Sequence, residues 1–197
     1  ASDALDKRRF SALQNPELWS SDEALKVQLI PNKEQGTLTI SDNGIGMNEE
    51  DLKQSLGTIA WSGSREFLKQ QLEAKSPDAK DLPQLIGQFG VGFYSSFLVS
   101  ERVEVVSRAA GTDKAYRWES TGEGGFSIDE AERAQAGTSI ILHLKKESLE
   151  YAVPYRLRQL VERYSDYLSY PIELLKTGTE GEFEPINRGT ALWQRSP

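Results

Sequence analysis

The sequence predicts an α+β fold, a two-layer sandwich in which helices cover a mostly antiparallel sheet. The chain has 197 residues, which is enough for one domain with a substantial core. Hydrophobic residues make up 38% and charged residues 27%, as in ordinary globular proteins. Segments with strand periodicity come first, helical segments follow, and further strands come after them. This order favours the two-layer sandwich over a parallel doubly wound fold.

The first part of the chain is predicted to hold a hairpin between two helices. In order, these elements are a helix at 1–14, strands at 25–30 and 37–40, and a helix at 49–56. Asn48 is expected to cap the second helix, and its first turn, Glu49, Glu50 and Asp51, suits the positive end of a helix dipole. The first helix has no start signal, because Leu5 stands where a capping box needs Glu or Gln. We therefore expect part of this helix to lie upstream of the chain.

The middle of the chain, about 57–94, is predicted to be a mobile lid. Glycine clusters bracket this segment, and it contains one plausible helix at 65–74 and a polar loop at 75–81. A long segment with glycines at both ends behaves like a flap with hinges rather than a packed layer.

The remainder is predicted to be mostly sheet. The expected elements are strands at 103–108, 114–119, 125–128, 138–144 and 171–175, with a helix at 154–167. Residues 177–197 are polar and contain three glycines, so they are predicted to form a linker that leaves the domain. The domain itself is therefore expected to cover 1–176.

Composition narrows the function classes. Cysteine is absent, which excludes disulfides, thiolate chemistry and Cys-ligated zinc. Lys and Arg total 23 against 30 Asp and Glu, and a net charge of −7 makes nucleic acid an unexpected partner. The basic run Lys7–Arg9 is expected to be a solvated helix face. No stretch approaches the ~20 apolar residues of a membrane span, and no secretory signal opens the chain, so we expect no membrane partner and a cytoplasmic location.

The segment Asp42–Met47 follows a predicted strand. A carboxylate at a strand end can accept hydrogen bonds from an exocyclic amine, such as that of adenine. Gly44 and Gly46 remove side chains, so that the backbone could touch a flat ligand. The alternative is an ordinary turn in which Asp42 is a stabilising acceptor.

Two further segments carry candidate chemistry. In the segment 87–93, three glycines precede an apolar helix and leave backbone N–H groups free for an anion, although the spacing is that of neither a P-loop nor a Rossmann fingerprint. The alternative is a glycine hinge without a ligand. Thr138 opens an apolar strand, and its hydroxyl either faces a pocket or belongs to a simple strand starter. His143, the only histidine, is expected to be a satisfied sheet residue.

Together these segments resemble the ATPase domain of the 90-kDa heat-shock chaperones, and the bacterial branch of that family most closely. The nonapeptide Gly-Gln-Phe-Gly-Val-Gly-Phe-Tyr-Ser at 87–95 is specific to it. Further matching segments are 1–7, 56–60, 170–172 and 191–193. Relatives of the gyrase, mismatch-repair and histidine-kinase types share the fold but have other residues in this loop. The resemblance therefore implies the ATPase fold common to these four groups.

The resemblance also implies a nucleotide pocket. Asp42 would accept from the adenine amine, with Thr138 and Gly46 helping through ordered water, and Met47 and Ala4 would pack against the base. The expected phosphate contacts are Gly90, Val91, Gly92 and Phe93. Ser55 stands where many relatives carry Asn, and it is included among the nucleotide contacts. Asp3 would lie near the pocket wall. Trp61 stands where relatives often carry Lys or Arg, and we expect it to pack under the lid.

The function implied is that of the ATP-binding and ATPase domain of a molecular chaperone. ATP or ADP would be the ligand, with Mg²⁺ in the intact parent, which would be a homodimer acting on unfolded clients with co-chaperones; this chain would be a monomer. In the family, the catalytic Glu and the magnesium-binding Asn come just before the residue matching Ala1, so we expect this chain to bind without hydrolysing. The alternatives are a non-catalytic nucleotide-binding module and a DNA-topology or repair ATPase. The net negative charge and the amino-acid sequence of 87–95 disfavour the DNA-topology or repair ATPase.

Overall fold

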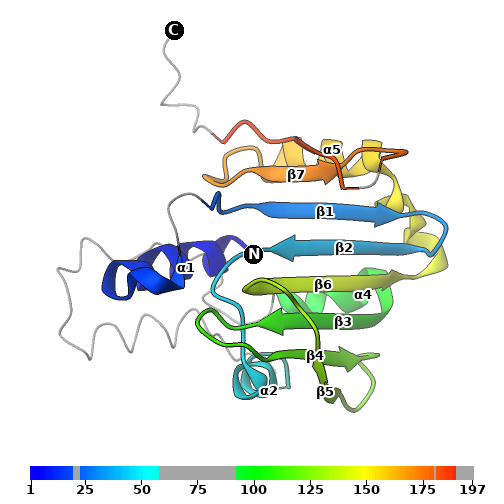
Figure 1. The fold of residues 1–197 in the computed structure, drawn as a ribbon. Coiled ribbons are helices and arrows are strands. Elements are labelled where there is room, and N and C mark those ends of the chain that lie inside the picture. Colours follow the sequence, from blue (N-terminus) through cyan, green and yellow to red (C-terminus); the bar gives the residue numbers. More distant parts are fainter. Residues whose placement is uncertain (20–22, 58–91, 180, 190–197) are drawn as a thin grey trace, which may run out of the picture.

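A computed structural model describes residues 1–19, 23–57, 92–179 and 181–189 of the chain. The described strands form one eight-stranded sheet in the order β5-β4-β3-β6-β2-β1-β7-β8 (Figure 1). In chain order the strands are β1 (Val27–Asn32), β2 (Thr37–Asp42), β3 (Ser100–Arg108), β4 (Ala115–Ser120), β5 (Ser127–Ala131), β6 (Gly137–Leu144), β7 (Ile172–Leu175) and β8 (Phe183–Pro185). Neighbours pair antiparallel except β1 and β7, which are parallel. The predicted α+β fold with a mostly antiparallel sheet is confirmed.

Helices lie on one face of this sheet and at the strand ends. The described helices are α1 (Ser2–Gln14), α2 (Glu49–Gly57), α4 (Ser96–Val99) and α5 (Pro154–Tyr164), with 3₁₀ turns η1 (Pro16–Leu18), η2 (Phe93–Ser95) and η3 (Lys146–Ala152). In Figure 1, α4 and α5 lie behind the sheet and α1 lies beside the ends of its central strands. The predicted helix at 154–167 ends earlier than expected, because the Ser165 N–H closes its last turn on the Val161 carbonyl.

The core lies between the sheet and the helices. Side chains alternate along each strand, so Val103 and Val105 on β3 point into the core with Leu142 and Leu144 on β6. Leu5 and Leu52 are fully buried from the helix side, as is Leu174 on β7. The opposite face is polar: His143 Nε2 lies 2.6 Å from Glu104 Oε1, so the expected satisfied sheet histidine is confirmed. The sheet therefore has one covered and one open face.

The position of β6 is the topological feature that matters for function. Strand β6 follows β5 in the chain, but in the sheet it lies between β3 and β2. Thr138 therefore pairs with Asp42 on one side and with Ser107 on the other. A residue that is 96 positions away from Asp42 in the chain thus becomes its direct neighbour in the sheet.

The C-terminal segment differs from the predicted linker at 177–197. Strand β8 pairs with β7. The side chain of Asn187 hydrogen-bonds to the backbone at and just before the start of β7. Its Oδ1 accepts from the Ile172 N–H at 2.7 Å, while Nδ2 donates to the carbonyls of Leu168 and Tyr170. Because one amide satisfies three backbone groups next to β7, the described residues 181–189 are held on the sheet.

Several predictions fall on residues 58–91 and 190–197, which lie outside the described residues. They are the lid helix at 65–74, Trp61 and the phosphate contacts Gly90 and Val91. Within the described ranges, none of the helices has the length and apolar character that crossing a membrane requires.

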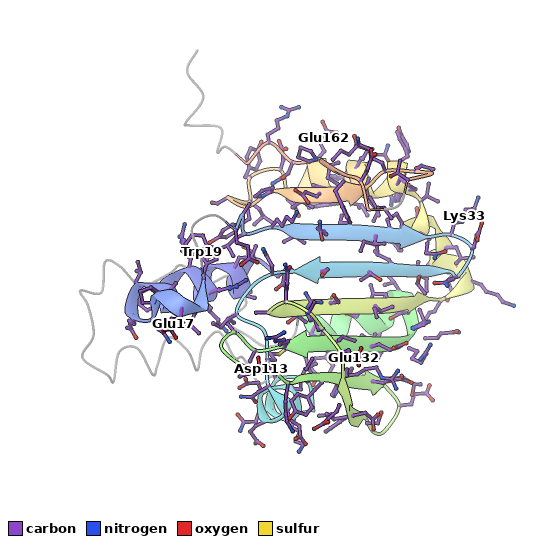
Figure 2. The ribbon with its side chains drawn as sticks, viewed as in Figure 1. Glu17, Trp19, Lys33, Asp113, Glu132 and Glu162 are labelled. Carbon is purple, nitrogen blue, oxygen red and sulfur yellow. The ribbon has the colours of Figure 1, made fainter. Side chains whose placement is uncertain are left out.

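Lys33 in the β1–β2 turn and Trp19 after α1 mark opposite ends of the central strands (Figure 2).

Candidate functional site

Asp42 ends strand β2 at the start of helix α1. The residue is 6% exposed, and its Oδ1 accepts from the Gly44 N–H at 2.9 Å. The nitrogen of Ala1 lies 3.8 Å from Oδ2. The structure therefore holds Asp42 as a buried acceptor with one oxygen engaged by the backbone.

The electrostatics of Asp42 combine opposing effects. Burial raises the pKa of its carboxyl, because desolvation penalises the charged form. The Gly44 N–H, the Arg133 guanidinium and the Thr138 N–H each lower that pKa. A buried carboxyl with a raised pKa is typical of functional sites as well as of structural ones, so the neighbours decide what it does.

Thr138 supplies a second acceptor next to Asp42. It is 5% exposed, and its Oγ1 lies 2.8 Å from Ser107 Oγ. Ser107 donates its hydroxyl proton to the Gly137 carbonyl at 3.1 Å and accepts from the Met47 N–H at 2.9 Å. Either hydroxyl can donate in the Ser107–Thr138 hydrogen bond, and in both cases the Thr138 oxygen keeps a lone pair that can accept from a further donor. Two adjacent acceptors fit a ligand group with two donor hydrogens.

Close backbone packing requires the two glycines after Asp42. A Cβ on Gly44 would lie 2.5 Å from the backbone carbon of Ala4. Gly46 has φ +69°, and a Cβ there would lie 1.9 Å from the Arg108 carbonyl oxygen. The Ile45 N–H donates to the Ala4 carbonyl at 2.9 Å, and the Ile45 carbonyl accepts from Ala110 at 2.8 Å. The space on the Cβ side of both glycines is thus filled by the backbones of α1 and of the end of β3.

The other expected contacts fall into two groups. In the first group, Ala4 and Met47 lie near Asp42, Gly46 and Thr138. Met47 is half-buried against the core. Ser55, near the end of α2, belongs to the second group, since the Tyr94 hydroxyl after Phe93 donates to the Leu56 carbonyl at 3.2 Å. The Phe93 ring packs edge-on against Trp118 at 5.5 Å, so only its backbone remains for phosphate. Gly92 is exposed.

The comparison with known proteins now identifies the family. Residues 18–124 match the model described as histidine kinase-, DNA gyrase B- and HSP90-like ATPase. The chain belongs to this ATPase family. The matched region contains Asp42 and the segment from Gly92, while Thr138 lies beyond it.

The similar proteins are bacterial chaperones. The chain is 52% identical to chaperone protein HtpG of Myxococcus xanthus over 206 residues, covering 100% of this chain and 31% of that protein. The HtpG proteins of Methylorubrum populi and Bordetella avium are 50% and 48% identical, over 99% and 100% of this chain. The predicted resemblance to the heat-shock ATPase domains is confirmed. The chain spans about a third of the length of these curated relatives, at 31% to 32%.

The loop of residues 43–48 between β2 and α2, the Asp42 loop, is held by an ion-pair network that the sequence did not predict. The prediction of a solvated basic run is wrong for Arg8, which is 7% exposed. Its Nη1 donates to the Asn43 carbonyl at 2.6 Å, and its Nη2 lies 3.0 Å from Glu23 Oε2. The Asn43 side chain donates to Glu23 and Ala24 and accepts from the Lys26 N–H. Tertiary packing turns Arg8 inward. The weak amphipathic pattern of α1 does not predict that the Arg8 side chain is buried.

Arg8→Ala is expected to lower the free energy of unfolding by about 2 kcal/mol, because it leaves the Glu23 carboxylate and the Asn43 carbonyl without their partner. The loss is smaller than for a fully buried pair, since the Glu23 side chain is 31% exposed. Urea denaturation measures it. Arg9→Ala is the matched control: the Arg9 side chain is 57% exposed and pairs with Asp6 at 3.5 Å, so its removal changes stability by less than about 0.5 kcal/mol. Equal losses would contradict the role assigned to Arg8.

The acidic side chains in the described parts of this ATPase domain do not cluster around a common point. No three Asp, Glu or His side chains in those parts gather closely enough to hold a metal ion. Glu49 pairs with Lys53, and Asp51 accepts from the Asn48 N–H while Asn48 accepts from the Asp51 N–H. These acidic residues therefore begin helix α2, as the sequence predicts, rather than binding a cation.

Proposed function

We propose that the chain is the nucleotide-binding module of an ATP-dependent chaperone, and that Asp42 recognises adenine through its exocyclic amine. The observation that carries this proposal is the pair of buried acceptors at the end of the sheet. Asp42 is 6% and Thr138 5% exposed, and the Thr138 oxygen keeps a lone pair that can accept beside its hydrogen bond with Ser107. An adenine amine has two donor hydrogens, which match two acceptors or one acceptor and a bridging water.

Each neighbour has a part in this proposal. Met47 and Ala4 would supply apolar contact to the base, and Gly46 would help through its backbone. Ser55 and the segment 90–93 would contact the ribose and phosphates, with the N–H groups of Gly92 and Phe93 as donors to the anion. Asp3 would line the pocket near α1. The segment 57–94 would close over bound nucleotide, which excludes water from the site.

The sharpest test of base recognition compares ADP with IDP, in which a carbonyl oxygen replaces the adenine amine. An oxygen facing the Asp42 carboxylate would leave two acceptors opposed, so IDP should bind about 100-fold more weakly than ADP. Isothermal titration calorimetry with both nucleotides in the same buffer measures this ratio. The two ligands carry the same ribose and phosphates, so those contacts cancel. Equal affinities would refute recognition of the amine.

A chaperone role is favoured over the DNA-topology and repair members of the family. The relatives reported above are chaperones at 48% to 52% identity, and the net charge of −7 opposes binding to nucleic acid. Hydrolysis of ATP with Mg²⁺, homodimer formation, co-chaperones, unfolded clients and a cytoplasmic location belong to the proposal for the longer protein. A non-catalytic binding module remains the second candidate.

A further inference from the structure

Arg133 reaches the end of the sheet from the loop between β5 and β6. Its Nη2 donates to the Asp42 carbonyl at 3.0 Å, and its Nη1 donates to Ser139 Oγ at 2.5 Å. Ser139 Oγ in turn lies 2.9 Å from Ser41 Oγ. Neighbouring side chains on a strand point to opposite faces, so Ser41 and Ser139 lie on the open face while Asp42 and Thr138 point into the covered one. The guanidinium therefore lies directly behind the two acceptors.

Arg108 holds the loop that carries Arg133. Its Nη1 donates to the carbonyls of Arg133 and Ala134 at 3.2 and 2.7 Å. Its Nε donates to Thr112, and Nη2 pairs with Asp113 at 3.3 Å. Residue 108 also provides the carbonyl against which Gly46 packs. The same residue therefore fixes both the Asp42 loop and the loop of the arginine behind it.

The hydrogen bonds of Arg133 do not by themselves explain why its guanidinium is partly buried. Its Nε is buried without a hydrogen-bond partner among the described residues. Burial also lowers the pKa of the Arg133 guanidinium, and only the charge of Asp42 opposes that shift. A partly desolvated cation with an unpaired N–H is costly, which points to a use for its charge.

We propose that Arg133 is a positioning residue for base recognition, which fixes the end of β2 through the Asp42 carbonyl and places a positive charge behind the Asp42 side chain. This inference rests on the proposed function of Asp42. Within the described ranges, the charged side chain that bears on that carboxylate is Arg133 from the β5–β6 loop. Arg8 faces the adjoining Asn43 carbonyl and is neutralised by Glu23. The facing residues of β6, Thr138 and Ser139, carry no charge.

The test uses Arg133→Gln, which removes the charge, and Arg133→Lys, which keeps it. The Asp42 carboxyl ¹³C shift is followed against pH in the nucleotide-free chain, and ADP affinity is measured by calorimetry across the same range. In Arg133→Gln the Asp42 midpoint should rise by about one pH unit. The ratio of wild-type to variant affinity should grow as the pH falls, up to about tenfold. This ratio cancels the titration of ADP itself.

The controls separate the charge from the fold. Arg133→Lys should follow the wild type in both measurements, and Arg163→Gln, an exposed change on α5, should alter neither. An unmoved Asp42 midpoint, or a lysine variant that behaves like the glutamine variant, would overturn the inference. So would loss of folding in both Arg133 variants, since the residue would then be structural. Equal binding of ADP and IDP would reject the proposed function. The Asp42 midpoint is measured without nucleotide, so it would still decide the inference about Arg133.

Discussion

Asp42→Asn is expected to weaken ADP binding about 100-fold or more while the chain remains folded. Asparagine has the same shape, and its oxygen can still accept from the Gly44 N–H, which lies 2.9 Å from Asp42 Oδ1. Its amide nitrogen then takes the place of Oδ2 and presents donors to the adenine amine. A charge-assisted hydrogen bond is replaced by two opposed donors in a buried site, and the desolvation of the ligand amine is no longer compensated.

The same substitution should not reduce stability at neutral pH. Burial raises the pKa of Asp42, so ionisation of its carboxyl is less favourable in the folded chain than in the unfolded one. The resulting penalty on folding is present above the folded-state pKa and disappears as the pH falls below the ordinary value of ~3.9. Asp42→Asn removes this penalty, so its free energy of unfolding at pH 7 should equal or exceed that of the wild type.

Calorimetry with ADP and urea denaturation at pH 7 measure the two effects. Asp129→Asn, on the exposed side of β5, makes the same chemical change away from the site and should alter neither quantity. Unchanged ADP affinity in Asp42→Asn would show that Asp42 does not contact the base. Lost affinity together with an unfolded chain would mean that the carboxylate is structural.

Gly46→Ala should be the most destabilising of the substitutions considered, with a loss of about 3 kcal/mol or more in the free energy of unfolding. Gly46 has φ +69°, and an added Cβ would lie 1.9 Å from the Arg108 carbonyl oxygen. The obstacle is a backbone atom in a paired strand, so it cannot rotate away as a side chain would. Relief requires the Asp42 loop to leave β3, which also breaks the hydrogen bond from Met47 N–H to Ser107.

Gly124→Ala is the matched control for Gly46→Ala. Gly124 has φ +88°, but nothing lies within 4 Å of a Cβ added there. This control therefore includes the unfavourable backbone conformation without the clash, at about 1 kcal/mol. Urea denaturation followed by circular dichroism compares the two variants. Similar losses would show that the Asp42 loop does not pack as closely against β3 as described.

Local patterns were sufficient for most of the fold. The alternation of apolar residues predicted strands such as 138–144, and β6 begins within one residue of that expectation, at Gly137. The acidic first turn after Asn48 predicted the start of α2. These features depend on neighbours within a few residues, which any single sequence displays. The linker prediction was less successful because β8 is short and is held by Asn187, whose partners lie 15 to 19 residues earlier in the chain.

The sequence by itself determined that an acidic residue ends a strand, that glycines follow it, and that the nonapeptide at 87–95 is that of the heat-shock ATPases. The tertiary structure decided what surrounds that acid. Arg133 and Thr138 come from chain segments about 90 residues away, and Arg8 turns inward to reach the carbonyl of Asn43, 35 residues on. Such contacts have no local signal, because burial and charge pairing depend on which strands become neighbours, and that is set only when the whole sheet assembles.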